Sequence, residues 1–397
     1  MKQETNQYTY ESIYIPILFV LLLVNTLYRS EYESLFTLGE VSTSIMFAGM
    51  FVYLIKSWMD RTTFDVSLNK IYLSFILFII AFSISFFTSE YMDGIKFINL
   101  LLLFAFILGS IRMKWRPIHF KIAGYVFSAA IIVFFIHWII SGFPMSGFKS
   151  IFRNENYLGV LMFCMLYFNI LSIKFGENKE RILFIVVTLM NLLLILTTSA
   201  RSVLLGIIMI VVSWIVLKSF RKHFRKLFYI VMIGNLLFVG VYVGIKNTFI
   251  GKMLNDLSVS IFNKNLFSGR NDIWASVIKV IVEKPWFGHG AGIRAFEIAA
   301  TEKTAHNMYL QLLLEVGVLG FILFVLLLIS IWYVLNKRLH YFVTKWSACF
   351  MLGILVYNSF ELTLFQNNYS IAAFQWLIMT IGISFTTDDK SNDLSLP

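Results

Sequence analysis

Four short polar groups interrupt a chain that is 58% hydrophobic and only 14% charged. Charged side chains are costly beside a membrane, so their positions are informative. These residue types could form an anion site, a base and a surface for hydroxyl groups. The groups are the turn 197–202 with Arg201, the segment 268–272 with Arg270, the loop 153–157 with Arg153, Asn154 and Asn156, and the pair His306 and Asn307 with Gln311 and Glu315 further along one helical face.

Arg201 and Arg270 are candidates for an anion-binding site. A guanidinium group binds phosphate oxygens through two parallel hydrogen bonds. Arg270 also comes at the start of a predicted helix, where backbone N–H groups favour anions. Two other roles stay open: Arg201 could anchor a span by extending to the membrane surface, and Arg270 could form an exposed pair with Asp272.

His306 is the candidate general base, because histidine gains and loses a proton near neutral pH. A single histidine at a helix start is more often structural, but His306 is predicted on the same face as Arg201 and Arg270. His289 and Glu315 are the next candidates for the base.

Amide side chains accompany both the histidine and one further cation. Asn307 and Gln311 are placed to orient the base or a sugar. Arg153, Asn154 and Asn156 combine a cation with amides, which suits sugar hydroxyl groups, although the same residues could form a solvated turn. The sequence contains no Walker loop, no dinucleotide-binding glycine motif, no His/Cys cluster and no Asp-x-Asp pair, so it predicts neither a cofactor nor a metal.

Long apolar runs must position these residues. A helix needs about 20 residues to cross roughly 30 Å of hydrocarbon, and no strand alternation typical of a barrel is present. We therefore expect an all-α integral membrane protein with about a dozen transmembrane helices. The predicted spans are 12–28, 38–57, 70–88, 95–111, 120–140, 157–173, 182–198, 202–218, 227–246, 307–334, 344–361 and 369–386.

The distribution of lysine and arginine sets the predicted orientation. These residues concentrate in alternate loops, which places both termini in the cytoplasm and puts few cations outside. This asymmetry accounts for the net charge of +11 without a nucleic-acid partner. The chain is expected to form a single polytopic membrane domain, 1–397, with a polar tail at 387–397.

One predicted outside loop, 247–306, is far longer than the others, and long loops are commonly functional. Within it, the segment 271–283 has apolar residues at helical spacing. We expect an amphipathic helix that lies on the membrane surface.

These motifs together resemble the O-antigen ligase and polymerase superfamily. The resemblance rests on Thr198–Ser202, Ser268–Arg270, the run Pro285-x-x-Gly288-x-Gly290, and His306-Asn307-x-x-Leu310 followed by Gly317. The Asn154-x-Asn156 loop is similar to a further family feature, with Glu155 where proline is common.

The resemblance implies a glycosyltransferase in the bacterial cytoplasmic membrane that uses a polyprenyl-pyrophosphate-linked glycan donor on the extracytoplasmic face. Its partners are then that donor, a glycan or lipid-linked acceptor, membrane lipid and other polysaccharide-assembly proteins. A ligase and a polymerase differ only in the acceptor. A transporter or flippase for a lipid-linked glycan is the alternative, and it would be expected to show internal repeats and broken helices. A structural scaffold would leave the clustered arginine and histidine residues unexplained.

Overall fold

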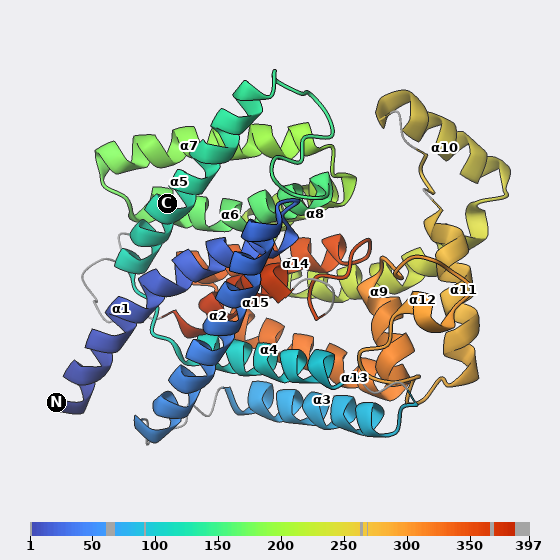
Figure 1. The fold of residues 1–397 in the computed structure, drawn as a ribbon, viewed down its shortest axis with the longest axis horizontal. Helices are drawn as coiled ribbons and strands as arrows, with labels where there is room; N and C mark the ends of the chain where they lie inside the picture. Colours follow the sequence, from blue (N-terminus) through green and yellow to red (C-terminus); the bar gives the residue numbers. More distant parts are fainter. Residues whose placement is uncertain are drawn as a thin grey trace.

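The computed structural model describes residues 2–60, 68–90, 93–262, 265–267, 269–365 and 369–385. Ser268 and the predicted tail 387–397 lie outside the described residues. Within these ranges all regular structure is helical, and one isolated antiparallel bridge joins Ser30 to Phe152. The expectation of an all-α integral membrane protein is confirmed (Figure 1).

Ten helical segments in the described ranges are long and apolar enough to cross a membrane. They correspond to the first ten predicted spans, with boundaries displaced by a few residues. The helices are α1 (Lys2–Asn25, continued by the 3-10 turn Thr26–Arg29), α2 (Glu33–Asp60), α3 (Asn69–Phe87), α4 (Gly94–Arg112), α5 (Pro117–Ile140), α6 (Glu155–Phe175), α7 (Asn178–Thr198), α8 (Arg201–Ser219), α9 (Arg221–Ile245) and α13 (Met308–Lys337).

The last two predicted spans contain shorter helices, α14 (Phe342–Tyr357) and α15 (Tyr369–Ser384), of 16 residues each. Such a helix is about 24 Å long, less than the hydrocarbon thickness of roughly 30 Å. The chain after α14 continues without a helix, yet Asn358, Leu362 and Leu364 are buried. Irregular backbone at membrane depth is tolerated where protein covers it. The end of the predicted span 344–361 is therefore buried irregular backbone and not the helix that was expected.

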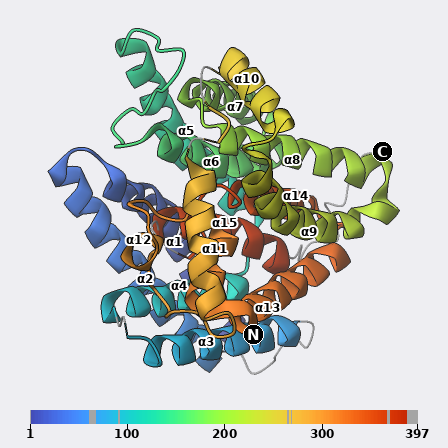
Figure 2. The same ribbon diagram turned by 90° about the vertical axis from the view of Figure 1, so that its right-hand side faces the viewer.

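The helices pack around α6 and α15. Nearly every residue of α15 is buried, and this helix lies in the middle of the molecule in both views (Figures 1 and 2). The outer helices α3, α8 and α9 instead expose isoleucine and leucine side chains such as Ile76, Ile208 and Leu237. A continuous apolar outer surface of this kind fits a lipid environment.

Helix α13 is broken at Gly317, where φ is 63° and ψ is −168°. A side chain at this position would come within 2.4 Å of the main chain of Trp286. The N–H groups that the break frees donate to the neighbouring segment: Val318 to the Pro285 carbonyl at 2.8 Å, and Leu319 to the Trp286 carbonyl at 3.2 Å. The break is therefore satisfied inside the protein.

Gly288 lies on the other side of the contact between α13 and the segment that begins at Pro285. Its φ is 72°, and a side chain there would come within 2.4 Å of the Glu315 carbonyl oxygen. The Pro285-x-x-Gly288-x-Gly290 run and Gly317 thus pack directly against each other, because neither glycine leaves room for a β-carbon.

The loop 247–306 differs from the expectation. It contains three helices, α10 (Phe249–Phe262), α11 (Arg270–Glu283) and α12 (Ala295–Ile298). The apolar face of α11, which was expected on the membrane surface, is buried against α9 and α13 and includes Trp274 and Val277. Helix α10, which was not predicted, projects from the bundle (Figure 1) and exposes Phe249 and Ile261.

Candidate functional site

His306 lies in the last turn of the loop before α13, and its side chain is 35% exposed. Its φ is 46°, a left-handed conformation that costs a residue other than glycine roughly 1–2 kcal/mol. Nδ1 of His306 is 3.6 Å from Oε2 of Glu361. Strained backbone of this kind is retained where the surroundings enforce it, commonly at functional sites.

Glu361 connects His306 to Arg270. Its Oε1 accepts a hydrogen bond from Arg270 Nη2 at 3.2 Å, and its side chain is only 15% exposed. The Arg270 guanidinium also lies over the Phe360 ring, 5.5 Å from its centroid. One carboxylate therefore faces both the candidate base and one of the two candidate anion ligands.

Backbone contacts hold Glu361 and His306 together. Asn307 caps α13 by accepting the Leu310 N–H at 3.0 Å, and its Nδ2 donates to the Ser359 carbonyl at 2.9 Å. The Met308 N–H donates to the Asn358 carbonyl at 3.0 Å. These bonds join the start of α13 to the segment that carries Glu361, which fixes the His306 backbone.

The segment after α14 is itself fixed by buried side chains. Asn358 Oδ1 accepts from the N–H and the hydroxyl of Thr363 at 3.2 and 3.1 Å. Asn358 Nδ2 donates to Gln375 Oε1 on α15 at 3.2 Å. These bonds join the segment to α15, so Glu361 is presented by a firmly held turn.

Arg201 and Arg270 line one cavity of about 250 Å³, here called the arginine cavity, together with Asn156, Lys303 and His306. Arg201 is the first residue of α8, and Ser199 before it has φ of 54°. Arg201 Nη1 donates to Ser258 Oγ at 3.1 Å, and Nη2 to the Asn265 carbonyl at 3.2 Å. Two cations thus face one space without lying in the same helix.

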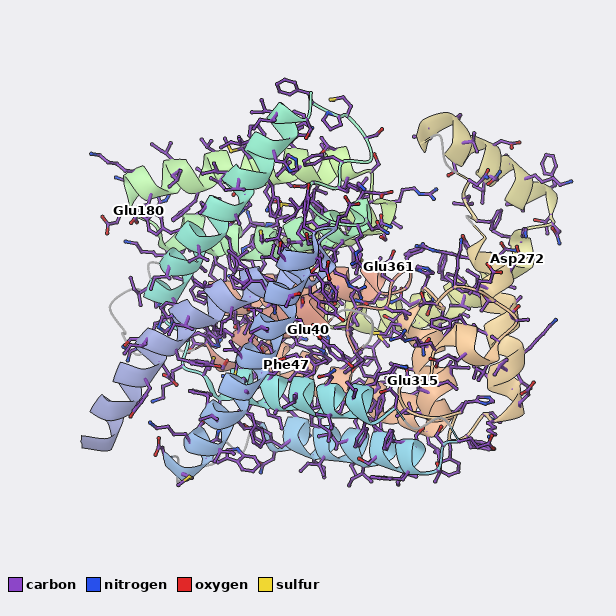
Figure 3. All side chains as sticks on the ribbon, in the orientation of Figure 1. Glu40, Phe47, Glu180, Asp272, Glu315 and Glu361 are labelled. Atoms are coloured by element: carbon purple, nitrogen blue, oxygen red, sulfur yellow. The ribbon has the colours of Figure 1, made fainter. Side chains whose placement is uncertain are left out.

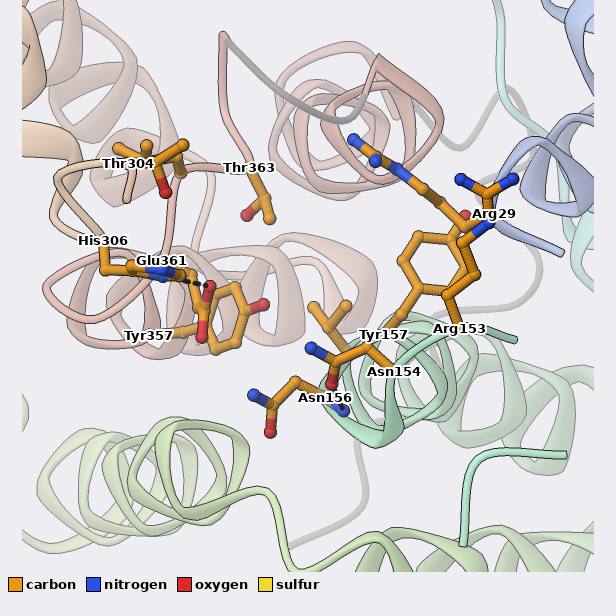
Figure 4. A pocket seen from close by; sticks show the side chains of 12 residues that line it. Arg29, Arg153, Asn154, Asn156, Tyr157, Thr304, His306, Tyr357, Glu361 and Thr363 are labelled. Carbon is orange, nitrogen blue, oxygen red and sulfur yellow. Dashed lines mark hydrogen bonds and ion pairs between the residues drawn. The ribbon is translucent and has the colours of Figure 1, made fainter. Parts of the chain in front are cut away.

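A second cavity of about 220 Å³, the central cavity, shares His306 and Asn156 with the arginine cavity. Figure 4 shows His306 and Glu361 on one side of it and Asn154 and Arg153 on the other. Its lining is Arg29, Arg153, Asn154, Asn156, Tyr157, Val160, Thr304, His306, Tyr357, Glu361, Leu362 and Thr363.

A third space, the apolar cavity, adjoins the two arginines. It measures about 540 Å³, and Arg201 and Arg270 are among its lining residues. The remaining lining is largely aliphatic and comes from α8, α9 and α10, with Ile208, Val241 and Leu257 among the residues. An anion site and a hydrocarbon-lined space are therefore adjacent.

The structure brings six of the sequence-predicted residues to these cavities: His306, Arg201, Arg270, Arg153, Asn154 and Asn156. Asn307 and Gln311 are instead buried and hold the backbone. Gln311 Nε2 donates to the Ile293 carbonyl at 2.6 Å and to Glu315 Oε1 at 2.9 Å. Of the alternative bases, His289 bonds to the Val280 carbonyl at 2.7 Å.

Sequence reasoning missed Glu361. A signal was present, because Glu361 is a single carboxylate at the end of a predicted span, where an ionisable residue is informative. Figure 3 shows Glu361, Glu315 and Asp272 towards one end of the helices and Glu180 towards the other. The chemistry-bearing residues therefore share one end of the molecule.

The part of the chain that carries Arg201, Arg270 and His306 matches a known family. Residues 183–325 match the O-antigen ligase family. This O-antigen ligase region runs from α7 into α13 and includes Arg201, Arg270, His306 and Gly317, so the resemblance predicted from the sequence is confirmed there. No curated protein matches the chain. The match supports a multi-pass membrane protein of the ligase or polymerase type that handles glycans.

Proposed function

We propose that the protein transfers or polymerises a polyprenyl-pyrophosphate-linked glycan on the extracytoplasmic face of the bacterial cytoplasmic membrane. The observation that carries the proposal is the chain of contacts Arg270–Glu361–His306 between the arginine cavity and the central cavity. The O-antigen ligase match supports the same class of reaction.

The donor occupies two adjoining cavities in this proposal. Its diphosphate binds Arg201 and Arg270, and its polyprenyl chain enters the apolar cavity beside them. Guanidinium groups stabilise the negative charge that develops on the leaving diphosphate. The arginines thereby take the role that a divalent metal has in other glycosyl transfers.

The acceptor hydroxyl enters the central cavity and meets His306. Its oxygen bonds to the anomeric carbon while the bond from that carbon to the diphosphate oxygen breaks. The electron pair leaves with the diphosphate, and the hydroxyl proton passes to His306. Displacement from the opposite face inverts the anomeric configuration.

Glu361 couples donor binding to the base. A carboxylate that accepts from one ring nitrogen of histidine fixes the tautomer and leaves the other nitrogen free as a base. The distance of 3.6 Å is long for a hydrogen bond, and such contacts commonly tighten with substrate bound. When a diphosphate binds Arg270, it replaces Glu361 as the partner of this arginine. Glu361 then contacts His306 only, so the base becomes fully active only with donor present.

The proposed orientation places both termini in the cytoplasm and residues 247–306 outside, in a single polytopic membrane domain. Ser260 on α10 and Ser219 at the end of α8 are both exposed, and Cys164 and Cys349 are buried. We expect a membrane-impermeant thiol reagent to label Ser260→Cys in intact spheroplasts and Ser219→Cys only after permeabilisation. The reverse pattern contradicts the orientation and the assigned face.

A flippase for a lipid-linked glycan is the second candidate, and the broken helix α13 favours it. The two functions separate in liposomes that contain purified protein and a fluorescent polyprenyl-diphosphate oligosaccharide. A transferase releases polyprenyl diphosphate and forms a longer glycan or a glycosylated acceptor. A flippase moves the intact donor between leaflets and breaks no bond, an outcome that contradicts the proposal.

A further inference from the structure

Arg29, Arg153 and Arg294 form a second group of arginines. Arg29 and Arg153 line the central cavity across from His306 (Figure 4). Arg29 and Arg294 line a further cavity of about 620 Å³, here called the lateral cavity. Arg29 therefore shares the central cavity with Arg153 and the lateral cavity with Arg294.

The backbone explains how two of these arginines meet. The Arg153 N–H donates to the Arg29 carbonyl at 3.1 Å, and Arg153 Nε donates to the Ser30 carbonyl at 3.1 Å. The bridge between Ser30 and Phe152 aligns the same two segments. Arg294 comes from a third segment, directly before α12. Three parts of the chain thus bring like charges to the central and lateral cavities, which share Arg29.

Among the described residues, Lys96 in the lateral cavity is paired with carboxylates, whereas the three arginines are not. Lys96 Nζ lies 3.1 Å from Asp93 Oδ2 and 3.5 Å from Glu297 Oε1. In the part of the chain that the structure describes, no ion pair joins Arg29, Arg153 or Arg294 to a carboxylate. Adjacent cations beside partly enclosed space repel one another and attract an anion.

Aromatic rings support each of the three guanidinium groups. The ring centroids of Tyr28, Phe36 and Phe296 lie 5.6, 5.5 and 5.6 Å from the Cζ atoms of Arg29, Arg153 and Arg294 respectively. Contact with a ring face restrains an arginine and leaves its N–H groups at the edge available. These N–H groups are thus available to the oxygens of an anion in the two cavities that share Arg29.

We propose that Arg29, Arg153 and Arg294 bind an anionic group of the acceptor, a phosphate or a sugar carboxylate, while the acceptor hydroxyl reaches His306. This inference rests on the proposed function. The donor diphosphate already has Arg201 and Arg270 beside the apolar cavity, whereas Arg29 and Arg153 line the central cavity across from the base and Arg294 lines the adjoining lateral cavity. Asn154 and Asn156 lie between them and suit the sugar hydroxyls of the acceptor.

The test compares three acceptors with purified full-length protein in nanodiscs and one donor. The acceptors share a glycan and differ in charge: a neutral alkyl glycoside, the same glycan on polyprenyl diphosphate, and the same glycan with a uronic acid. We expect the wild type to prefer one anionic acceptor roughly ten- to hundredfold in kcat/KM. Preference for the diphosphate identifies a lipid-linked acceptor, and preference for the uronic acid identifies an acidic sugar.

The variants Arg29→Gln and Arg294→Gln should reduce this preference to about one by raising the acceptor KM, with the donor KM unchanged. Lys279→Gln is the matched control, because Lys279 is an exposed cation on α11 that lines none of these cavities. Equal use of all three acceptors by the wild type overturns the inference. A raised donor KM in Arg29→Gln overturns it too, because the group then serves the donor.

A binding measurement separates this inference from the proposed function. Inorganic diphosphate is titrated into the double variant Arg201→Gln/Arg270→Gln, which lacks the donor arginines. We expect residual binding that Arg294→Gln weakens by about tenfold and Lys279→Gln leaves unchanged. If the wild type transfers no glycan, the proposed function fails, yet this titration still shows whether the second anion site exists. If Arg294→Gln leaves the residual binding unchanged, the second anion site does not exist.

Discussion

Two polar clusters of the molecule have different surroundings, and the first includes Arg112, the last residue of α4. In this cluster, Arg112 is 5% exposed and Ser57 is 2% exposed. Arg112 Nε donates to Ser57 Oγ at 2.7 Å, and Arg112 Nη2 donates to the Ser57 carbonyl at 2.6 Å. Glu11 beside them is 3% exposed and accepts from the Tyr53 hydroxyl at 2.7 Å. This cluster is closed.

The second cluster, Arg270, Glu361 and His306, is open. The side chains of Arg270, Glu361 and His306 are 22%, 15% and 35% exposed and line cavities. A closed cluster whose hydrogen bonds are completed within the protein contributes to stability. An open cluster holds charged groups at a cavity, where a substrate can complete their contacts. Substitutions in the two clusters should therefore have opposite consequences.

The largest effect is expected from His306→Ala. Loss of a general base should lower transfer on the order of a hundredfold to ten-thousandfold. The variant should reach the membrane at normal abundance and still bind the lipid-linked donor, which pull-down with donor analogue measures. Near-normal transfer at normal abundance rules His306 out as the base, and Glu315 and His289 become the residues to substitute.

Arg112→Ala should show the opposite pattern. It removes two hydrogen bonds from a buried charged group, a loss on the order of 3 kcal/mol in the free energy of unfolding. We expect lower abundance and a lower unfolding temperature in detergent, whereas kcat of the remaining folded protein stays close to wild type. A large fall in kcat with normal stability would show that the closed cluster also serves the reaction.

Glu361→Gln should have an intermediate effect. Glutamine keeps the shape of the side chain but removes the charge that faces both Arg270 and His306. Transfer should fall on the order of tenfold or more, because the base loses its orienting carboxylate. Donor affinity should hold or improve, since Arg270 no longer has a competing anion. A variant that weakens donor binding instead indicates that Glu361 serves to position Arg270.

A smaller effect is expected from Arg270→Lys, which keeps the charge but loses the planar arrangement of donors. Donor affinity and turnover should each fall by roughly tenfold or less. Arg221→Lys at the start of α9 is the matched control, because Arg221 is exposed and lines none of the cavities described here. Unchanged kinetics in Arg270→Lys would remove Arg270 from the donor site.

Much of the fold could be predicted because it depends on local sequence. Each of the first ten spans is a run of apolar residues long enough to satisfy its own backbone in lipid, so its limits are visible without tertiary information. The same logic did not show where α14 ends, because buried irregular backbone after Tyr357 completes the span predicted at 344–361. It also placed α11 on the membrane, since an amphipathic pattern does not say whether lipid or α13 covers the apolar face.

The candidate site was predictable only in part for a similar reason. His306, Arg201 and Arg270 belong to motifs with recognisable neighbours in sequence. Glu361 reaches His306 only through the bonds from Asn307 and Met308 to the turn after α14. Contacts between residues so far apart in the chain leave no trace in spacing or hydrophobic period.

The most direct test of the central claim is glycan transfer by the purified wild-type protein in the presence of EDTA, with the product's anomeric configuration determined by NMR. Direct displacement at arginine-bound diphosphate predicts transfer that persists in chelator, release of polyprenyl diphosphate, and an anomeric centre inverted relative to the donor. A retained configuration contradicts the single displacement, and activity that chelator abolishes and magnesium restores contradicts the assignment of the diphosphate charge to Arg201 and Arg270.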